Sequence, residues 1–258
     1  MIEALLWDVD GTLAETERDG HRIAFNQAFK ALNIPWRWNE QRYGVLLRVS
    51  GGRERLLHDM RFQEDAPAET AKREQLAERL HGLKNQLYAD IVARGLLTLR
   101  DGVRELMEDC ELAKVRMGIV TTTSRCNVDA LLASQLGLDW PARFATIVCA
   151  EQAPRKKPHP QAYFAALQSL QLEPHRAVAI EDAAAGVSAA QAAGIPVVIT
   201  HSHYFPSVNS KRALAVGASL GRAHDWTPSA DERAGRVGLQ QITQWRGDFV
   251  CIQASDLG

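Results

Sequence analysis

The chain of 258 residues is long enough for one large domain or two, and its 46% hydrophobic and 24% charged content is ordinary for a soluble globular protein. A formal net charge of -1 gives no electrostatic reason to expect a nucleic acid or an anionic membrane as a partner. No apolar run approaches the ~20 residues that span a bilayer. The N-terminus has neither the basic region nor the cleavage site of a secretory signal.

The sequence contains four scattered cysteines and no Cys-x-x-Cys pair: Cys110, Cys126, Cys149 and Cys251. This pattern is typical of reduced thiols, so we expect a cytoplasmic protein.

The first predicted element is a short apolar run that ends in two carboxylates. We expect a buried strand at residues 4–9, followed by an active-site loop at Gly11. Residues two apart in an extended chain project to the same side, so Asp8 and Asp10 can face one small volume. Two carboxylates this close raise each other's pKa unless a cation lies between them. The pair predicts either a bound metal or a protonated acid, although Asp-x-Asp alone is more often a strand end with two solvated aspartates.

A long stretch with helical periodicity follows this strand. We predict a helix at about residues 23–32, two shorter helices at about 45–60 that are separated by Ser50, Gly51 and Gly52, and one long amphipathic helix at 67–93. No strand is expected in this part of the chain. Residues 15–92 are therefore predicted to form a helical domain inserted after the first strand.

From residue 101 onward, helices and short apolar strands alternate. Further strands are expected at residues 117–120, 144–149, 177–180 and 196–199. Wholly apolar strands that alternate with helices indicate an α/β fold, a Rossmann-like parallel sheet covered on both faces. We assign residues 1–14 and 93–220 to this core. Residues 221–258 lose the alternation and are expected to form a surface extension with one helix near 237–245.

Polar side chains follow the successive strands at the edge where their carboxyl ends meet. The set comprises Asp8 and Asp10, the hydroxyl run Thr121, Thr122, Thr123 and Ser124, then Lys157, and finally Glu181 and Asp182. Ligands of open parallel sheets bind at this edge. Carboxylates suit Mg²⁺, whereas hydroxyls and a lysine suit a phosphate. Singly, the hydroxyls fit a helix N-cap, the lysine a solvated loop and the last two acids a capping pair, but their coincidence at four strand ends favours a phosphate site.

This set of residues resembles the motifs of the haloacid dehalogenase superfamily, specifically its phosphatases and phosphomutases with a small helical cap. The first motif matches residues 8–13 (Asp-Val-Asp-Gly-Thr-Leu), the second Thr121, the third Lys157 with Pro158, and the fourth Glu181 with Asp182. Residues 14–17, 36–38, 47–55 and 121–125 are similar to those of CbbY-type phosphatases, which are associated with the Calvin cycle. The resemblance covers about residues 1–205 and implies nothing for the tail.

The resemblance implies a mechanism and a metal. Asp8 would attack phosphorus and form an aspartyl-phosphate, and Asp10 would act as general acid and base, a role that a raised pKa would favour. Mg²⁺ would be bound by Asp8, Glu181, Asp182 and the backbone carbonyl of Asp10. Thr121 and Lys157 would neutralise and position the phosphoryl group.

The resemblance also implies a substrate, xylulose 1,5-bisphosphate or a related sugar phosphate. A second phosphate needs a second anion site, which could comprise Arg53 and the backbone N–H groups of Gly51 and Gly52, with Thr123, Ser124 and Arg125 from the core side. Thr122 is expected to bind substrate as well. Glu17 and His21 could reach sugar hydroxyls, although His21 fits a surface helix position equally well. A β-phosphoglucomutase-like phosphomutase shares nearly all these residues and stays the alternative. A non-catalytic phosphosugar-binding protein would lack an acid or the lysine. We expect a monomer.

Overall fold

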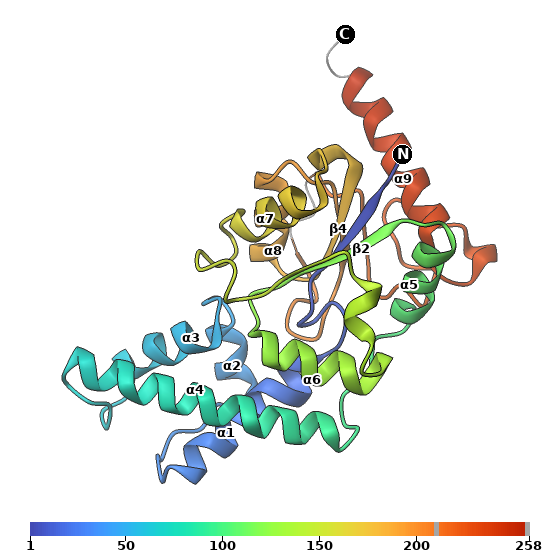
Figure 1. Ribbon diagram of the computed structural model, residues 1–258. Coiled ribbons are helices and arrows are strands. Elements are labelled where there is room, and N and C mark those ends of the chain that lie inside the picture. Colours follow the sequence, from blue (N-terminus) through green and yellow to red (C-terminus); the bar gives the residue numbers. More distant parts are fainter. Residues whose placement is uncertain (209–211, 256–258) are drawn as a thin grey trace.

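The centre of the fold is a six-stranded parallel sheet with the strand order β3-β2-β1-β4-β5-β6 (Figure 1). The structure is a computed structural model that describes residues 1–208 and 212–255, and the side chains from residue 250 onward, including Cys251, lie outside the described part. The strands are β1 Ala4–Trp7, β2 Arg116–Val120, β3 Thr146–Val148, β4 Ala177–Glu181, β5 Val197–Thr200 and β6 Ala215–Gly217. The parallel α/β sheet predicted from the sequence is confirmed.

The register of the central strands brings three polar loops together. In β1, Trp7 pairs with Ile119 of β2 and with Ile180 of β4. The residues that follow these three positions therefore emerge at one edge of the sheet, next to each other. Strand β6 was not predicted, because three residues of the sequence Ala-Val-Gly carry too little apolar pattern to signal a strand.

Alternate side chains of β1 enter two different cores. Leu5 and Trp7 pack on one face, whereas Ala4 and Leu6 pack on the other. The first face is covered by α5 Val103–Leu112, α6 Arg125–Leu136 and α9 Leu239–Ser255, and the second by α7 Gln161–Leu170 and α8 Ala184–Ala192. None of the described helices is long and apolar enough to cross a membrane.

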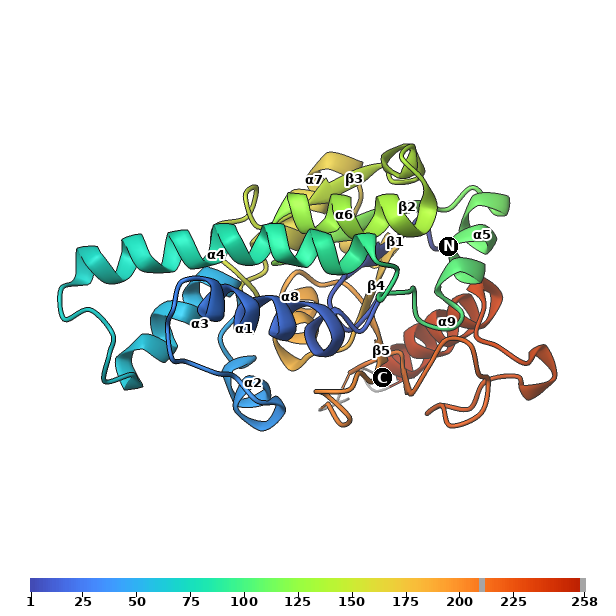
Figure 2. The same ribbon diagram turned by 90° about the horizontal axis from the view of Figure 1, so that it is seen from below.

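The helical insert has a core of its own and lies over the carboxyl edge of the sheet (Figure 2). It comprises the π-turn η1 Glu17–His21 and the helices α1 Arg22–Ala31, α2 Glu40–Leu46, α3 Gly52–Asp59 and α4 Thr70–Ala93. Phe25, Phe29, Trp36 and Trp38 pack together in its interior. The long helix α4 packs both against α1 within the insert and against α6 of the core. Short 3₁₀ turns occur at η2 Met60–Phe62, η3 Trp140–Arg143, η4 Pro174–Arg176 and η5 Glu232–Ala234.

The C-terminal segment is part of the core, which corrects the expectation of a surface extension. Trp226 and Trp245 stack with ring centroids 5.1 Å apart, and Val237 and Ile242 are fully buried. These side chains belong to the same core as α5 and the face of β1 that carries Leu5 and Trp7. Arg236 binds Asp109 of α5 through two hydrogen bonds of 2.9 and 2.8 Å. The expected helix begins at Leu239 and is longer than predicted.

Because Ile242 is fully buried, the substitution Ile242→Ala is expected to lower the free energy of unfolding by about 2–5 kcal/mol, as for other deletions of a buried aliphatic side chain. Urea denaturation followed by circular dichroism measures this loss. Leu138→Ala is the matched control, since Leu138 is 92% exposed and should change little. Equal stability of Ile242→Ala and the wild type would contradict the assignment of α9 to the core.

Candidate active site

A cavity of about 680 Å³ lies between the carboxyl edge of the sheet and the helical cap, the part of the chain from η1 to α4. Residues from the ends of β1, β2 and β4 form its floor, and residues of η1, α3 and α4 form its opposite side. The predicted residues that line it are Asp8, Asp10, Glu17, His21, Gly51, Gly52, Arg53, Thr122, Thr123, Ser124, Lys157, Glu181 and Asp182. One cavity thus gathers nearly the whole set from distant parts of the chain.

Three buried carboxylates lie close together on the cavity floor. One oxygen from each of Asp8, Glu181 and Asp182 lies within 4.8 Å of the others, and the three residues are 7%, 1% and 1% exposed. The pKa of Asp8 is raised to about 7: burial is the largest influence, Lys157 opposes it, and the charges of Glu181 and Asp10 add to it. Burial and Asp8 likewise hold the pKa of Asp182 well above its ordinary range. This donor set of hard, mutually repelling oxygens fits a divalent cation such as Mg²⁺.

Lys157 connects the acids to the sheet. Its Nζ donates to Asp8 Oδ1, to Glu181 Oε1 and to the backbone carbonyl of Val120, each at 2.7 Å. Burial alone would lower the pKa of this ammonium, but Asp8 and Glu181 hold it above the ordinary value for lysine. With all three protons of the ammonium in use, Lys157 is a fixed positive charge that positions Asp8.

Two further side chains orient the acids, and sequence reasoning missed both. The Tyr163 hydroxyl donates to Glu181 Oε1 at 2.5 Å, and the Ser202 hydroxyl donates to Asp182 Oδ2 at 2.6 Å. Tyr163 belongs to an apolar helix pattern, so nothing in the sequence marked its hydroxyl as part of a site. Gly186 leaves room for Glu181, because a Cβ there would lie 1.9 Å from the carboxylate.

The environment of Asp10 differs from that of Asp8. Its carboxylate accepts hydrogen bonds from Thr16 (2.5 Å) and Thr123, and His21 Nε2 lies 3.0 Å from Oδ1. Burial by itself would raise the pKa of Asp10, but His21 and these hydrogen bonds together hold it well below the ordinary value for aspartate. The pKa of Asp10 is thus not raised in the way that would favour the expected acid role. The Asp10 side chain is also outside the three-acid cluster, so only its backbone carbonyl stays a predicted metal ligand.

His21 is not a surface histidine. It is 3% exposed and stacks on Tyr88 of α4 with ring centroids 4.2 Å apart. Thr16, like His21, comes from the segment in which the chain enters the cap. The immediate partners of Asp10 are therefore supplied by the cap as well as by the core.

The cap side of the cavity carries most of its positive charge. Glu17 lies 3.4 Å from the buried Arg55 and accepts a hydrogen bond of 2.5 Å from the hydroxyl of Tyr43. Arg53 is 37% exposed and forms an ion pair of 3.2 Å with Glu78. Lys84 of α4 is 3% exposed and has no carboxylate partner among the described residues. Burial lowers the pKa of its ammonium to about 8.

Two predicted site residues do not line the cavity. Thr121 is buried behind it, where its hydroxyl accepts a hydrogen bond from the backbone N–H of Thr123 at 3.2 Å. Arg125 forms an ion pair with Asp129 at 2.9 Å and lies over the ring of Trp140. A contact of Arg125 with substrate would require its side chain to leave these partners.

Comparison with known proteins places this geometry in a family. Residues 2–194 match the sequence model of haloacid dehalogenase-like hydrolases. The chain is similar to the plasmid-encoded protein CbbY of Cupriavidus necator, at 39% identity over 92% of this chain and 98% of that protein. It is also similar to protein CbbY of Rhodobacter capsulatus, at 41% identity over 79% of this chain and 87% of the relative.

Solved structures agree with these sequence relatives. A CbbY variant from Rhodobacter sphaeroides in complex with xylulose 1,5-bisphosphate has a TM-score of 0.74 and 37% identity, covering 79% of this chain and 88% of that one. A β-phosphoglucomutase from Clostridium difficile has the same TM-score at 20% identity, covering 97% of this chain and all of that one. At that identity the second likeness concerns the fold alone.

The raised pKa of Asp8 predicts how metal binding depends on pH. Its folded value of about 7 exceeds the ordinary 3.8, so between these values the folded protein holds a proton that the unfolded chain lacks. Stability without metal therefore falls as the pH rises through this window. A divalent cation competes with that proton, so Mg²⁺ should raise Tm more at pH 8 than at pH 5.

Differential scanning fluorimetry with and without Mg²⁺ at the two pH values measures this difference. NaCl of equal ionic strength is the control for screening, and Asp182→Asn should lose most of the Mg²⁺-dependent shift. Equal Mg²⁺ shifts at pH 5 and pH 8 would contradict the prediction.

Proposed function

Because the chain belongs to the haloacid dehalogenase-like hydrolases, and within them to the CbbY-type phosphatases, we propose that it is a Mg²⁺-dependent phosphatase of sugar bisphosphates that acts through an aspartyl-phosphate. The observation that carries this proposal is the cavity itself. It holds a three-acid cluster with a fixed lysine on one side and, on the other, the buried Lys84, which forms no ion pair with a carboxylate of the described residues. Xylulose 1,5-bisphosphate, the ligand of the related Rhodobacter sphaeroides structure, is the substrate that we propose.

Asp8 is the proposed nucleophile. Lys157 holds its Oδ1, so the carboxylate is fixed before a substrate arrives. An ionised Asp8 can attack phosphorus without a general base, since a carboxylate has no proton to lose. The bond between phosphorus and the sugar oxygen breaks as the aspartyl-phosphate forms, and water then releases inorganic phosphate. Asp8, Asp182 and the backbone carbonyl of Asp10 would hold Mg²⁺, and Glu181 would bind it directly or through water. The cation would neutralise charge on the acids and on the phosphoryl group.

Asp10 is the proposed general base and acid. Its lowered pKa suits the second step, in which an ionised carboxylate takes a proton from the attacking water. In the first step it must instead donate a proton to the departing sugar oxygen. A sugar oxygen that enters the cavity can replace a donor such as Thr16 or Thr123 at Asp10. Loss of such a hydrogen bond raises the pKa of Asp10 toward the value that proton donation needs.

Lys84 and Arg53 are the proposed partners of the second phosphate. Both line the cavity on the cap side, away from the three acids. A buried ammonium without a carboxylate partner costs free energy unless an anion binds to it. A phosphate at Lys84 supplies that charge, and binding of the dianion should raise the pKa of the ammonium from about 8. Gly51 and Gly52 bring backbone N–H groups to the same side.

The two aspartates should respond differently to substitution. Asp8→Asn is expected to abolish turnover of every phosphate ester, because no covalent intermediate can form. Asp10→Asn is expected to lower kcat for the sugar bisphosphate by about 10²–10⁴-fold, the usual contribution of general acid–base catalysis. The loss should be much smaller for the formation of phospho-enzyme from p-nitrophenyl phosphate, whose leaving group needs no proton. Steady-state assays and quenched-flow measurements of acid-stable phospho-enzyme follow these effects.

Circular dichroism of both variants controls for folding, and assays with EDTA test the need for Mg²⁺. Appreciable activity of Asp8→Asn would rule out the covalent route. Formation of glucose 6-phosphate from β-glucose 1-phosphate, with slow release of inorganic phosphate, would indicate a phosphomutase in place of a phosphatase.

The second anion site should distinguish bisphosphates from monophosphates. Lys84→Met keeps the length and apolar stem of the side chain but removes its charge. We expect it to raise KM for xylulose 1,5-bisphosphate at least about tenfold, as the loss of a charged hydrogen bond of about 1.5–3 kcal/mol implies. KM for a sugar monophosphate should stay nearly unchanged. Arg53→Ala should act in the same direction but less strongly, because solvent and Glu78 already screen Arg53.

Steady-state kinetics with both substrates measures the two KM values. Arg79→Met is the matched control, since it removes a cation from the same helix outside this cavity. Equal effects of Lys84→Met on bisphosphate and monophosphate would contradict the second anion site.

A further inference from the structure

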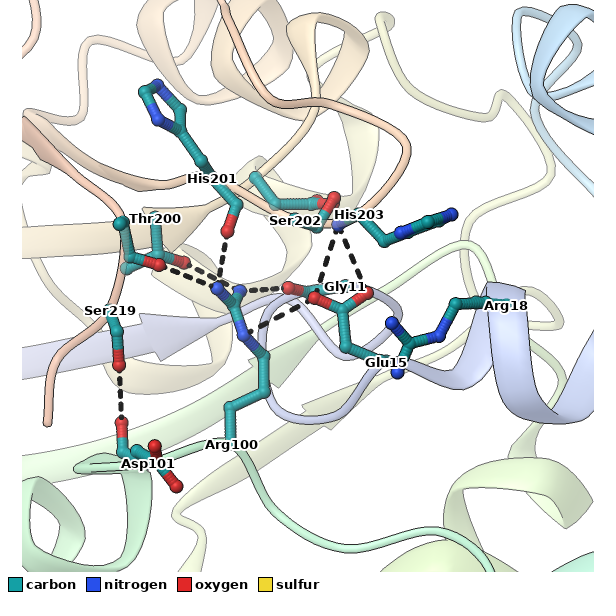
Figure 3. A network of polar contacts seen from close by, with 12 residues as sticks. Gly11, Glu15, Arg18, Arg100, Asp101, Thr200, His201, Ser202, His203 and Ser219 are labelled. Carbon is teal, nitrogen blue, oxygen red and sulfur yellow. Dashed lines mark hydrogen bonds and ion pairs between the residues drawn. The ribbon is translucent and has the colours of Figure 1, made fainter.

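Arg100 is the centre of a polar cluster outside the cavity (Figure 3). It lies in the segment that returns from the cap to the core, between the end of α4 and the start of α5. Its side chain is only 13% exposed. The guanidinium donates to the backbone carbonyls of Gly11, His201 and Ala218, the last at 3.0 Å, and to the Thr200 hydroxyl at 3.3 Å.

Two of these carbonyls belong to the segments that contact Asp182. Gly11 lies directly against the Asp182 carboxylate, because a Cβ at Gly11 would be 2.0 Å from Asp182 Oδ2. Ser202 donates its hydroxyl hydrogen bond to the same Oδ2 at 2.6 Å. The Gly11 segment and the Ser202 segment therefore hold Asp182 between them. The first of these segments also carries Asp8 and Asp10.

Arg100 connects the two segments by hydrogen bonds to both. Its bond to Gly11 is one residue from Asp10, and its bond to His201 is one residue from Ser202. A guanidinium suits this task, because its five N–H groups form a rigid planar fork that can serve several carbonyls at once. The cluster does not contact the proposed metal directly but holds the segments that orient its ligands, as outer hydrogen-bond partners do in other metal sites.

The same arginine also joins the two linkers of the cap. Its backbone N–H donates to the carbonyl of Leu13 at 2.8 Å, and its guanidinium forms an ion pair of 3.7 Å with Glu15. Leu13 and Glu15 lie in the outgoing linker and Arg100 in the returning one. Glu15 in turn accepts from the backbone N–H of His203 at 3.2 Å. Both linkers between core and cap therefore form hydrogen bonds with the backbone of the Ser202 segment, which contacts Asp182.

We propose that Arg100 is a positioning residue for the metal-binding acids: by fastening the Gly11 and His201 carbonyls it holds Asp182 and the loop of Asp8 in the geometry that binds Mg²⁺. Arg100 does not line the cavity and touches no substrate. Its loss should therefore weaken metal binding and lower kcat, and should affect substrate affinity much less. This inference rests on the proposed Mg²⁺-dependent function of the same site.

The test compares Arg100→Gln and Arg100→Lys with the wild type. Mn²⁺ replaces Mg²⁺ as a probe of binding in the absence of substrate, with free Mn²⁺ measured by electron paramagnetic resonance. Arg100→Gln is expected to weaken Mn²⁺ binding about 10–100-fold, the usual effect of removing a supporting partner of a metal ligand. With p-nitrophenyl phosphate at saturating Mg²⁺, kcat should fall at least about fivefold while KM changes by less than about twofold. Arg100→Lys should be intermediate, because an ammonium keeps the charge but cannot span the same carbonyls.

Two matched variants separate positioning from other effects. Arg116→Gln removes an arginine that also binds a backbone carbonyl, that of Leu170 at 2.9 Å, and pairs with Glu3, but it lies at the opposite end of β2. It should leave Mn²⁺ affinity and kcat unchanged. Glu15→Gln breaks the ion pair to Arg100 but keeps an oxygen that can accept from His203, so it should retain nearly wild-type Mn²⁺ affinity.

All values are normalised to the folded fraction measured by circular dichroism. Should Arg100→Gln fail to fold, Arg100→Lys carries the test by itself. Mn²⁺ affinity equal to that of the wild type in a folded Arg100 variant would overturn the proposal. Failure of the proposed function has a different signature: a wild type that needs no divalent cation refutes it directly. A wild type that needs the cation but ignores xylulose 1,5-bisphosphate refutes only the substrate and leaves the role of Arg100 intact.

Discussion

The constraint on which the site depends is the repulsion among three buried carboxylates. Asp8 follows β1, Glu181 is the last residue of β4 and Asp182 follows it, and the register of β1 with β4 brings the three acids together. One lysine compensates part of this charge, since Lys157 contacts two of the three acids. Burial and, after it, the remaining negative charge raise the pKa values of Asp8 and Asp182, so ionisation of these two acids in the folded chain is unfavourable. The divalent cation that we propose would relieve the repulsion among the acids and would return Asp8 to the ionised form that the proposed nucleophile needs.

The strand-end chemistry was predictable from the sequence because it depends on local patterns. Short apolar runs marked β1, β3 and β4, and the carboxyl ends of parallel strands meet at one edge, so the sequence itself predicts that Asp8, Lys157 and Asp182 lie together there. Such reasoning needs only the order of the strands and the residue that follows each one. It says nothing about which side chains lie opposite that edge.

What the sequence could not predict depends on contacts between distant segments. The burial of Lys84 follows from how α4 is rotated where it packs on both α1 and α6, and a lysine on an amphipathic helix is usually solvated. The burial of Trp226 and Trp245 requires a partner surface on α5, with Arg236 bound to Asp109, and an irregular tail carries no periodic signal of such a partner. Tyr163 and Ser202 were missed for the same reason: their hydroxyls have a role only because the fold aims them at Glu181 and Asp182.

Asp10 shows how the two parts of the chain depend on each other. It projects from the loop after β1, yet Thr16 and His21, which lower its pKa, come from the entrance to the cap, and His21 is held by its stacking on Tyr88 of α4. The proton affinity of a core acid is therefore a property of the cap's position. If the cap moved away, Asp10 would lose hydrogen-bond donors that lower its pKa and also the burial that raises it, so both influences on the pKa depend on the cap. Because one crossing between core and cap carries Asp10, Thr16 and His21 within twelve residues, the proton transfer that we propose for Asp10 would depend directly on the position of the cap.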